Sequence, residues 1–158
     1  MNAKDPVNGT SDQTTGPIIV AVDLSPESLY ALDLAAAIAE PQGSPLHVVH
    51  VHHGPASLSV SASATVEFER AETEVDALIK DAMLEHLAAF GGDWDLVSRR
   101  GNIGHELLAE ADDVDAELIV VGHRSHGTMR DMLLGSVASN IVHHSRRSVL
   151  VAIPPKDN

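Results

Sequence analysis

The chain has 158 residues, of which 44% are hydrophobic and 3% aromatic, so it fits one domain with a core built mainly from Val, Ile, Leu and Ala. Its 10 Lys and Arg against 23 Asp and Glu give a formal net charge of -13, which repels nucleic acid and anionic lipid and argues against both as partners. Cysteine is absent, which excludes disulfides, thiolate chemistry and cysteine-based zinc sites.

Both ends of the sequence are polar and lack periodicity. Residues 1–17 are rich in Gly, Pro, Ser, Thr and Asn, which cannot bury enough apolar surface to offset the entropy of ordering. They predict a flexible N-terminal tail, residues 154–158 predict a C-terminal tail, and one domain is expected at residues 18–153. No run reaches the roughly 18 apolar residues of a membrane span, and no signal-peptide pattern is present, so we expect a cytoplasmic protein with no membrane partner.

Strand-like apolar runs alternate with segments of helical periodicity. Ser25 before Pro26 predicts a helix start, because Ser caps first-turn N–H groups and Pro lacks one. The expected strands are residues 18–23, 46–53, 94–100, 116–122 and 148–153, and the expected helices are residues 25–40, 65–90, 103–114 and 136–144. The inner face of the second helix is expected to carry Val75, Leu78, Ile79, Ala82 and Ala89.

This alternation predicts the fold class. Five strands separated by four crossovers, each long enough for a helix, indicate a parallel sheet with right-handed connections. The expected architecture is therefore a single three-layer α/β domain with helices on both faces of the sheet. Ligands of such sheets bind outside the carboxyl ends of the strands, where the strand order reverses. That rule points to Asp23, Val51, Gly122 and their neighbours.

A glycine-rich stretch follows the fourth expected strand. Gly122 ends that strand, and Gly135 with Ser136 begins the last helix. Unpaired N–H groups and the helix dipole at such a start favour an anion, and glycine lets a phosphate approach the backbone closely. The alternative is that the glycines only close turns and that Ser136 is an N-cap. The pattern by itself leaves both interpretations open.

Three segments together carry a family resemblance. "VAVDLSPES", "VVHVHH" and "LIVVGHRSHGTMRDMLLGSVASNIVHHSRRSVLVA" resemble the universal stress protein family, whose last motif is G-x-x-G, nine residues, then G-[S/T]. The resemblance covers about residues 18–153. It implies a five-stranded parallel sheet in the order 3-2-1-4-5, a homodimer through the strand Ser148–Ile153, and a cytoplasmic stress-response module that binds ATP or another adenine nucleotide, with or without Mg2+.

The resemblance also implies the site residues. Members that bind nucleotide hold the adenosine end with an Asp after the first strand and a Val at the end of the second. Transferred residue by residue, the contacts to the adenosine end fall on Ala21, Val22, Asp23 and Val51. The phosphate loop falls on Gly122, Gly135, Ser136 and Val137.

One position departs from the family motif. Its second glycine falls on Ser125, and Gly127 comes two residues later. If the position needs a positive φ or a bare backbone, Ser125 obstructs the phosphates; otherwise its hydroxyl donates to them. Both interpretations stay open, and we include Ser125 and Gly127 among the candidate site residues.

The ten histidines do not predict a metal site. Strand alternation puts His50 and His52 on one face and His53 on the other, so at most two of these three point together. His143 and His144 are expected to stabilise the negative end of the last helix. We therefore expect no metal.

The sequence contains no G-x-S-x-G, Walker lysine or dinucleotide motif, and we expect no catalytic residue and at most slow ATP hydrolysis. Arg124 and Arg130 either neutralise phosphate charge or lie on the surface, and the sequence leaves both interpretations open. Two other hypotheses remain: a nucleotide-free dimeric interaction protein, and a small-molecule hydrolase or transferase that uses the same cleft. The sequence does not identify a downstream protein partner.

Overall fold

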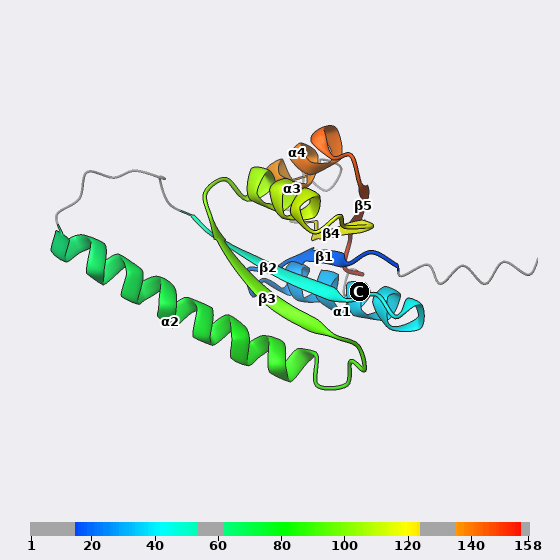
Figure 1. Cartoon of the computed structure of the whole chain (residues 1–158), viewed down its shortest axis with the longest axis horizontal. Coiled ribbons are helices and arrows are strands. Elements are labelled where there is room, and N and C mark those ends of the chain that lie inside the picture. Colours follow the sequence, from blue (N-terminus) through cyan, green and yellow to red (C-terminus); the bar gives the residue numbers. More distant parts are fainter. Residues whose placement is uncertain (1–14, 54–61, 124–134, 156–158) are drawn as a thin grey trace, which may run out of the picture.

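The computed structural model describes residues 15–53, 62–123 and 135–155 (Figure 1). Within these residues five strands and four helices alternate along the chain. The strands are β1 (Ile18–Ala21), β2 (Leu46–His52), β3 (Trp94–Arg100), β4 (Leu118–Gly122) and β5 (Ser148–Ala152). The helices are α1 (Pro26–Gln42), α2 (Ala62–His86), α3 (Ile103–Asp113) and α4 (Ser136–His144).

All strand pairs are parallel, and the sheet order is β3-β2-β1-β4-β5. Ile18 of β1 pairs with Leu46 on one side and Leu118 on the other, so the strand order reverses at β1. Helices α1 and α2 cover one face of the sheet, and α3 and α4 cover the other (Figure 1). The predicted fold class and strand order are confirmed.

Each face of the sheet buries its own apolar cluster. Alternate residues of a strand point to opposite faces, so Ile18 and Val20 pack toward α1 while Ile19 packs toward α3 and α4. All three side chains are at most 1% exposed. Strands buried on both faces are continuous apolar runs, which is why β1 and β4 contain almost no polar residue.

Helix α2 differs most from the sequence-based expectation. It spans Ala62–His86 rather than residues 65–90, and its buried side chains are Ile79, Met83 and Leu87 just beyond its end. Leu78 was expected on the inner face but is 64% exposed. The contact line follows the i, i+4 ridge through Ile79, and Leu78 lies about 100° away from it around the helix.

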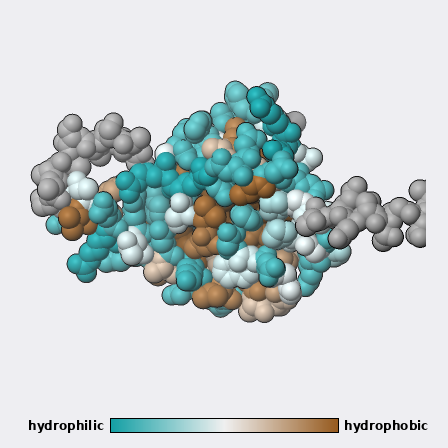
Figure 2. Space-filling view, viewed as in Figure 1, coloured by the Kyte–Doolittle hydropathy of each residue, from teal (hydrophilic) through white to brown (hydrophobic). Residues whose placement is uncertain are grey.

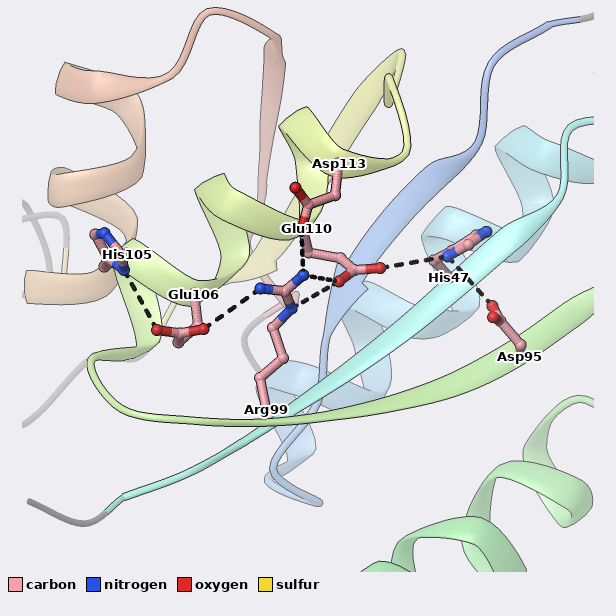
Figure 3. Close-up of polar contacts among 7 residues, drawn as sticks. All are labelled: His47, Asp95, Arg99, His105, Glu106, Glu110 and Asp113. Carbon is pink, nitrogen blue, oxygen red and sulfur yellow. Dashed lines mark hydrogen bonds and ion pairs between the residues drawn. The ribbon is translucent and has the colours of Figure 1, made fainter. Parts of the chain in front are cut away.

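An ion-pair network fastens α3 to β3 (Figure 3). Arg99 of β3 meets three carboxylates of α3: its side chain lies 2.6 Å from Glu110, 2.5 Å from Asp113 and 3.5 Å from Glu106. Glu110 is 7% exposed and also lies 3.7 Å from His47 on β2. Burial disfavours the charge of Arg99, yet its hydrogen bonds to Asp113 and Glu110 outweigh burial and raise the pKa of the guanidinium. Arg99 therefore stays charged at any physiological pH.

Figure 2 shows hydrophilic side chains over most of one face, with smaller hydrophobic areas between them. None of the helices in the described residues is long and apolar enough to cross a membrane.

Replacing Arg99 with Met should lower the free energy of unfolding by about 3 kcal/mol, because the buried Glu110 carboxylate loses its charged partner. Urea denaturation followed by circular dichroism measures the change. Arg70→Met is the matched control, since Arg70 forms an exposed pair with Glu74 on α2 and should cost less than about 0.5 kcal/mol. An equal loss of unfolding free energy in the two variants would contradict a stabilising role for the ion-pair network around Arg99.

Candidate functional site

A cavity of about 120 Å3 opens at the carboxyl edge of the sheet, beside the point where the strand order reverses. It lies among the ends of β1, β2 and β4 and the starts of α1, α3 and α4. Its lining residues are Ala21, Val22, Asp23, Ser25, Glu27, Ser28, Val49, Val51, Ile103, Val121, Gly122 and Val137. This is the position at which parallel α/β sheets bind their ligands.

Six of the ten residues proposed from the sequence line this cavity together: Ala21, Val22, Asp23, Val51, Gly122 and Val137. Gly135 and Ser136 come directly before Val137 at the start of α4 but do not line the cavity. Ser125 and Gly127, like Arg124 and Arg130, lie outside the described residues. The binding roles of all ten residues stay predictions.

The turn between β1 and α1 orients the Asp23 carboxylate. Asp23 Oδ1 accepts hydrogen bonds from the backbone N–H of Ser25 at 3.0 Å and from its hydroxyl at 2.5 Å. Ser25 is the N-cap of α1, as predicted, and its Oγ accepts from the N–H of Ser28 at 3.3 Å. Leu24 between them has a left-handed backbone with φ 62°. The carboxylate is thus fixed at the cavity edge by its own turn.

At Gly122 the backbone of β4 comes so close to the first turn of α1 that only glycine fits. A Cβ added there would lie 2.5 Å from the carbonyl oxygen of Glu27 and 3.0 Å from the backbone nitrogen of Ser28. Any side chain at this position pushes the first turn of α1 away from β4. This packing explains the glycine without reference to a ligand.

The start of α4 lies beside the cavity and carries no side-chain cap in the described part of the chain. Its N-cap is Gly135, which has no side chain to accept a hydrogen bond, and Val137 in the first turn lines the cavity. The first N–H groups of a helix have no partner within the helix and form the positive end of its dipole. The arrangement suits an anion at this end of the cavity.

The sequence did not single out several lining residues. Val49 precedes Val51 by two positions on β2 and so shares its face, a signal that strand periodicity contains. Glu27 and Ile103 occupy first turns of helices that begin at this edge of the sheet, and their approach depends on how α1 and α3 cross the strands.

Several histidines in the described residues have structural partners. His50 Nδ1 lies 2.9 Å from the carbonyl oxygen of Val22, and His52 Nε2 lies 2.8 Å from Asp76 Oδ1. His144 Nδ1 lies 2.8 Å from the carbonyl of Asn140 in the last turn of α4, as expected for a helix end. The described part of the chain contains no group of three His, Asp or Glu side chains that could hold a metal.

The fold and the cavity define a parallel α/β domain with a cavity at its strand-order reversal. The sequence profile of the universal stress protein family matches residues 14–152, and the chain belongs to this family. It is 33% identical over 146 residues to universal stress protein A homolog 1 of Coxiella burnetii, a match that covers 84% of this chain and 92% of that protein.

Solved structures agree with this assignment. Universal stress protein UspA from Lactobacillus plantarum has a TM-score of 0.72 and 25% identity, with 88% of this chain and 97% of that chain covered. The universal stress protein from Archaeoglobus fulgidus in complex with dAMP has a TM-score of 0.56 and 25% identity, covering 88% of this chain and 98% of that one. The family resemblance seen in the sequence is thus confirmed.

Gly122→Ala should lower the free energy of unfolding by about 1–3 kcal/mol, because the added methyl group overlaps the backbone of Glu27. Thermal and urea denaturation measure the loss. Gly91→Ala is the control, since a Cβ there meets only the flexible carboxylate of Glu40 at 3.3 Å, and it should change stability by less than about 0.5 kcal/mol. Equal stability of the Gly122→Ala and Gly91→Ala proteins would contradict the close approach.

Proposed function

We propose that this protein binds an adenine nucleotide in the cavity beside β1 and β4 and serves as a cytoplasmic stress-response module. The observation that carries the proposal is the position of Asp23, Val51 and the uncapped start of α4 around one cavity. A carboxylate accepts hydrogen bonds from amino and hydroxyl groups, and a helix start attracts phosphate. These are the two ends of a nucleotide.

The comparison with relatives adds support. The Archaeoglobus fulgidus relative that shares 25% of its residues with this chain was solved with dAMP bound. The apolar side chains of Val49, Val51 and Ile103 in the cavity lining fit the faces of a purine ring. ATP, with or without Mg2+, is one member of the proposed ligand class, and slow ATP hydrolysis is the most activity we propose.

The Val137→Phe variant tests the proposal. The larger ring fills the cavity from the first turn of α4, so affinity for AMP should fall by about 10-fold or more. Isothermal titration calorimetry of the purified protein, first checked for copurified nucleotide by its absorbance, measures the affinity.

Val142→Phe is the matched control, because Val142 is on the same helix and 44% exposed. It should bind AMP as the wild type does. If the wild type binds no adenine nucleotide, the nucleotide-free interaction protein becomes the better account. Steady product formation would favour an enzyme.

We also propose that two copies pair through β5. This strand pairs with β4 on one side and is at the edge of the described sheet, and Ile153 beyond its end is 66% exposed. The carbonyl of Ala152 accepts from His123 N–H at 2.8 Å, so Ala152 faces β4 and the backbone of Val151 faces outward. Unpaired edge groups of an apolar strand are a site for pairing with a second copy.

Val151→Pro should convert a dimer into a monomer, because it removes an outward N–H without touching the bonds to β4. Size-exclusion chromatography with light scattering measures the mass, and circular dichroism checks that the variant is folded. A wild type that is monomeric at micromolar concentration, or a folded dimeric variant, would contradict pairing through this edge.

A further inference from the structure

Helix α2 is held to the sheet by few buried side chains. Figure 1 shows its N-terminal part extending beyond the ends of β2 and β3. Among the described side chains of α2, only Ile79 and Met83 are buried, whereas the shorter helix α1 buries five. Much of the α2 surface is therefore open to solvent.

Polar contacts fix how α2 is turned on the sheet. Asp76 Oδ1 lies 2.8 Å from His52 Nε2 on β2 and accepts a hydrogen bond from the Ser98 hydroxyl on β3 at 2.7 Å. One helical turn before Asp76, Glu72 pairs with Arg100 of β3. Both carboxylates lie on the side of α2 that carries its two buried side chains. These contacts hold the neighbouring face of the helix away from the sheet.

That neighbouring face carries a line of apolar side chains, which we call the α2 seam. Its members are Phe68, Ala71, Val75, Leu78 and Ala82. They are alternately three and four residues apart, the heptad spacing by which one helix packs along another. Phe68 is 41% exposed, Val75 is 39% exposed and Leu78 is 64% exposed. The seam is thus a helix-packing surface on which no helix lies in the described part of the chain.

A row of carboxylates follows the outer edge of the seam. Each member is exposed and comes one position before a seam residue: Glu67, Glu74 and Asp81. They are seven residues apart, so they lie on one side of the helix, beyond the seam from the sheet. Of the nearby cations, Arg70 pairs with Glu74 and Arg100 pairs with Glu72. A helix that packs on the seam therefore meets an acidic flank, and cations on that helix complement it.

A second copy of the chain does not supply those cations. In an antiparallel pair of α2 helices, the acidic row of one copy faces the acidic row of the other. In a parallel pair, the row faces the line of Glu72 and Ile79. Like charges at such positions are destabilising, so the charge pattern favours a different partner.

We propose that the α2 seam is a docking surface for a protein partner, and that the partner contributes an amphipathic helix with Lys or Arg along its flanks. The apolar side of that helix covers the seam, and its cations meet the acidic row. The formal net charge of -13 attracts such a partner at longer range. This inference goes beyond the proposed function, because it concerns another face of the molecule and does not depend on nucleotide.

A synthetic peptide of three heptads is the probe, with Leu at the two apolar positions of each heptad and Lys at the two flanking positions. Fluorescence anisotropy of the labelled peptide, titrated with the full chain at physiological ionic strength, measures binding. The Lys peptide should bind at micromolar protein concentrations. The same peptide with Glu in place of Lys should bind at least about 10-fold more weakly, because its charges repel the acidic row.

Leu78→Gln tests the apolar part of the surface. It should weaken binding of the Lys peptide by about 10-fold or more, because a large exposed side chain of the seam is lost. Leu84→Gln is the matched control, since Leu84 is 53% exposed on the same helix but lies about 120° around it from Leu78. The control should bind the peptide as the wild type does.

Glu67→Lys tests the acidic row. It should weaken binding of the Lys peptide by about 3-fold, because one attraction is replaced by a repulsion. Glu117→Lys changes the net charge equally, at an exposed position that precedes β4 at the amino edge of the sheet. It should bind more tightly than Glu67→Lys. Circular dichroism checks that all four variants are folded.

The outcomes decide between the occupants of the seam. Absence of binding to the Lys peptide overturns the proposal. Equal affinity of the wild type and Leu78→Gln also overturns it, because the peptide then binds the overall acidic charge. Equal binding of the Lys and Glu peptides overturns a basic partner. A mass measured by light scattering that Leu78→Gln halves would assign the seam to a second copy instead. None of these outcomes depends on nucleotide binding.

Discussion

The contact between the end of β4 and the first turn of α1 is the constraint on which the site depends. Gly122 allows the two backbones to meet, and this fixes where α1 begins relative to the sheet. In the sheet, β1 lies between β2 and β4. The connections that follow β1 and β4 therefore leave in different directions and open a space above the ends of these two strands. The same close packing therefore holds the fold together and shapes the cavity.

Local signals in the sequence were sufficient for the fold class, whereas the strand order came from the family resemblance. Short apolar runs, the Ser25 cap with Pro26 and the crossover lengths specify strands, helices and parallel pairing, because these depend on neighbouring residues. The face of α2 was partly wrong, since apolar residues such as Leu78 lie beside the contact line and periodicity does not separate them from it. The carboxylates at 106, 110 and 113 have helical spacing, but their shared partner Arg99 appears only when α3 packs on β3.

The candidate site was predictable to the extent that it depends on strand ends. The carboxyl ends of parallel strands meet at one edge, so Asp23, Val51 and Gly122 were expected to gather there, and they line one cavity. The contribution of Glu27 was not predictable, because it comes from the angle at which α1 crosses β4. The cavity that results is lined by both polar and apolar residues, among them Asp23, Ser25 and Glu27 on one hand and Val49, Val51 and Ile103 on the other.

The left-handed turn at Leu24 has a consequence for the evolution of this scaffold. An L-residue with φ 62° stores about 1–2 kcal/mol that glycine does not, and asparagine tolerates this conformation better than leucine. Mutational drift at position 24 toward Gly or Asn is thus permitted, whereas Val and Ile are excluded by their branched Cβ atoms. Since Leu24 does not line the cavity, replacing it by Gly or Asn relieves backbone strain without changing a side chain of the cavity lining.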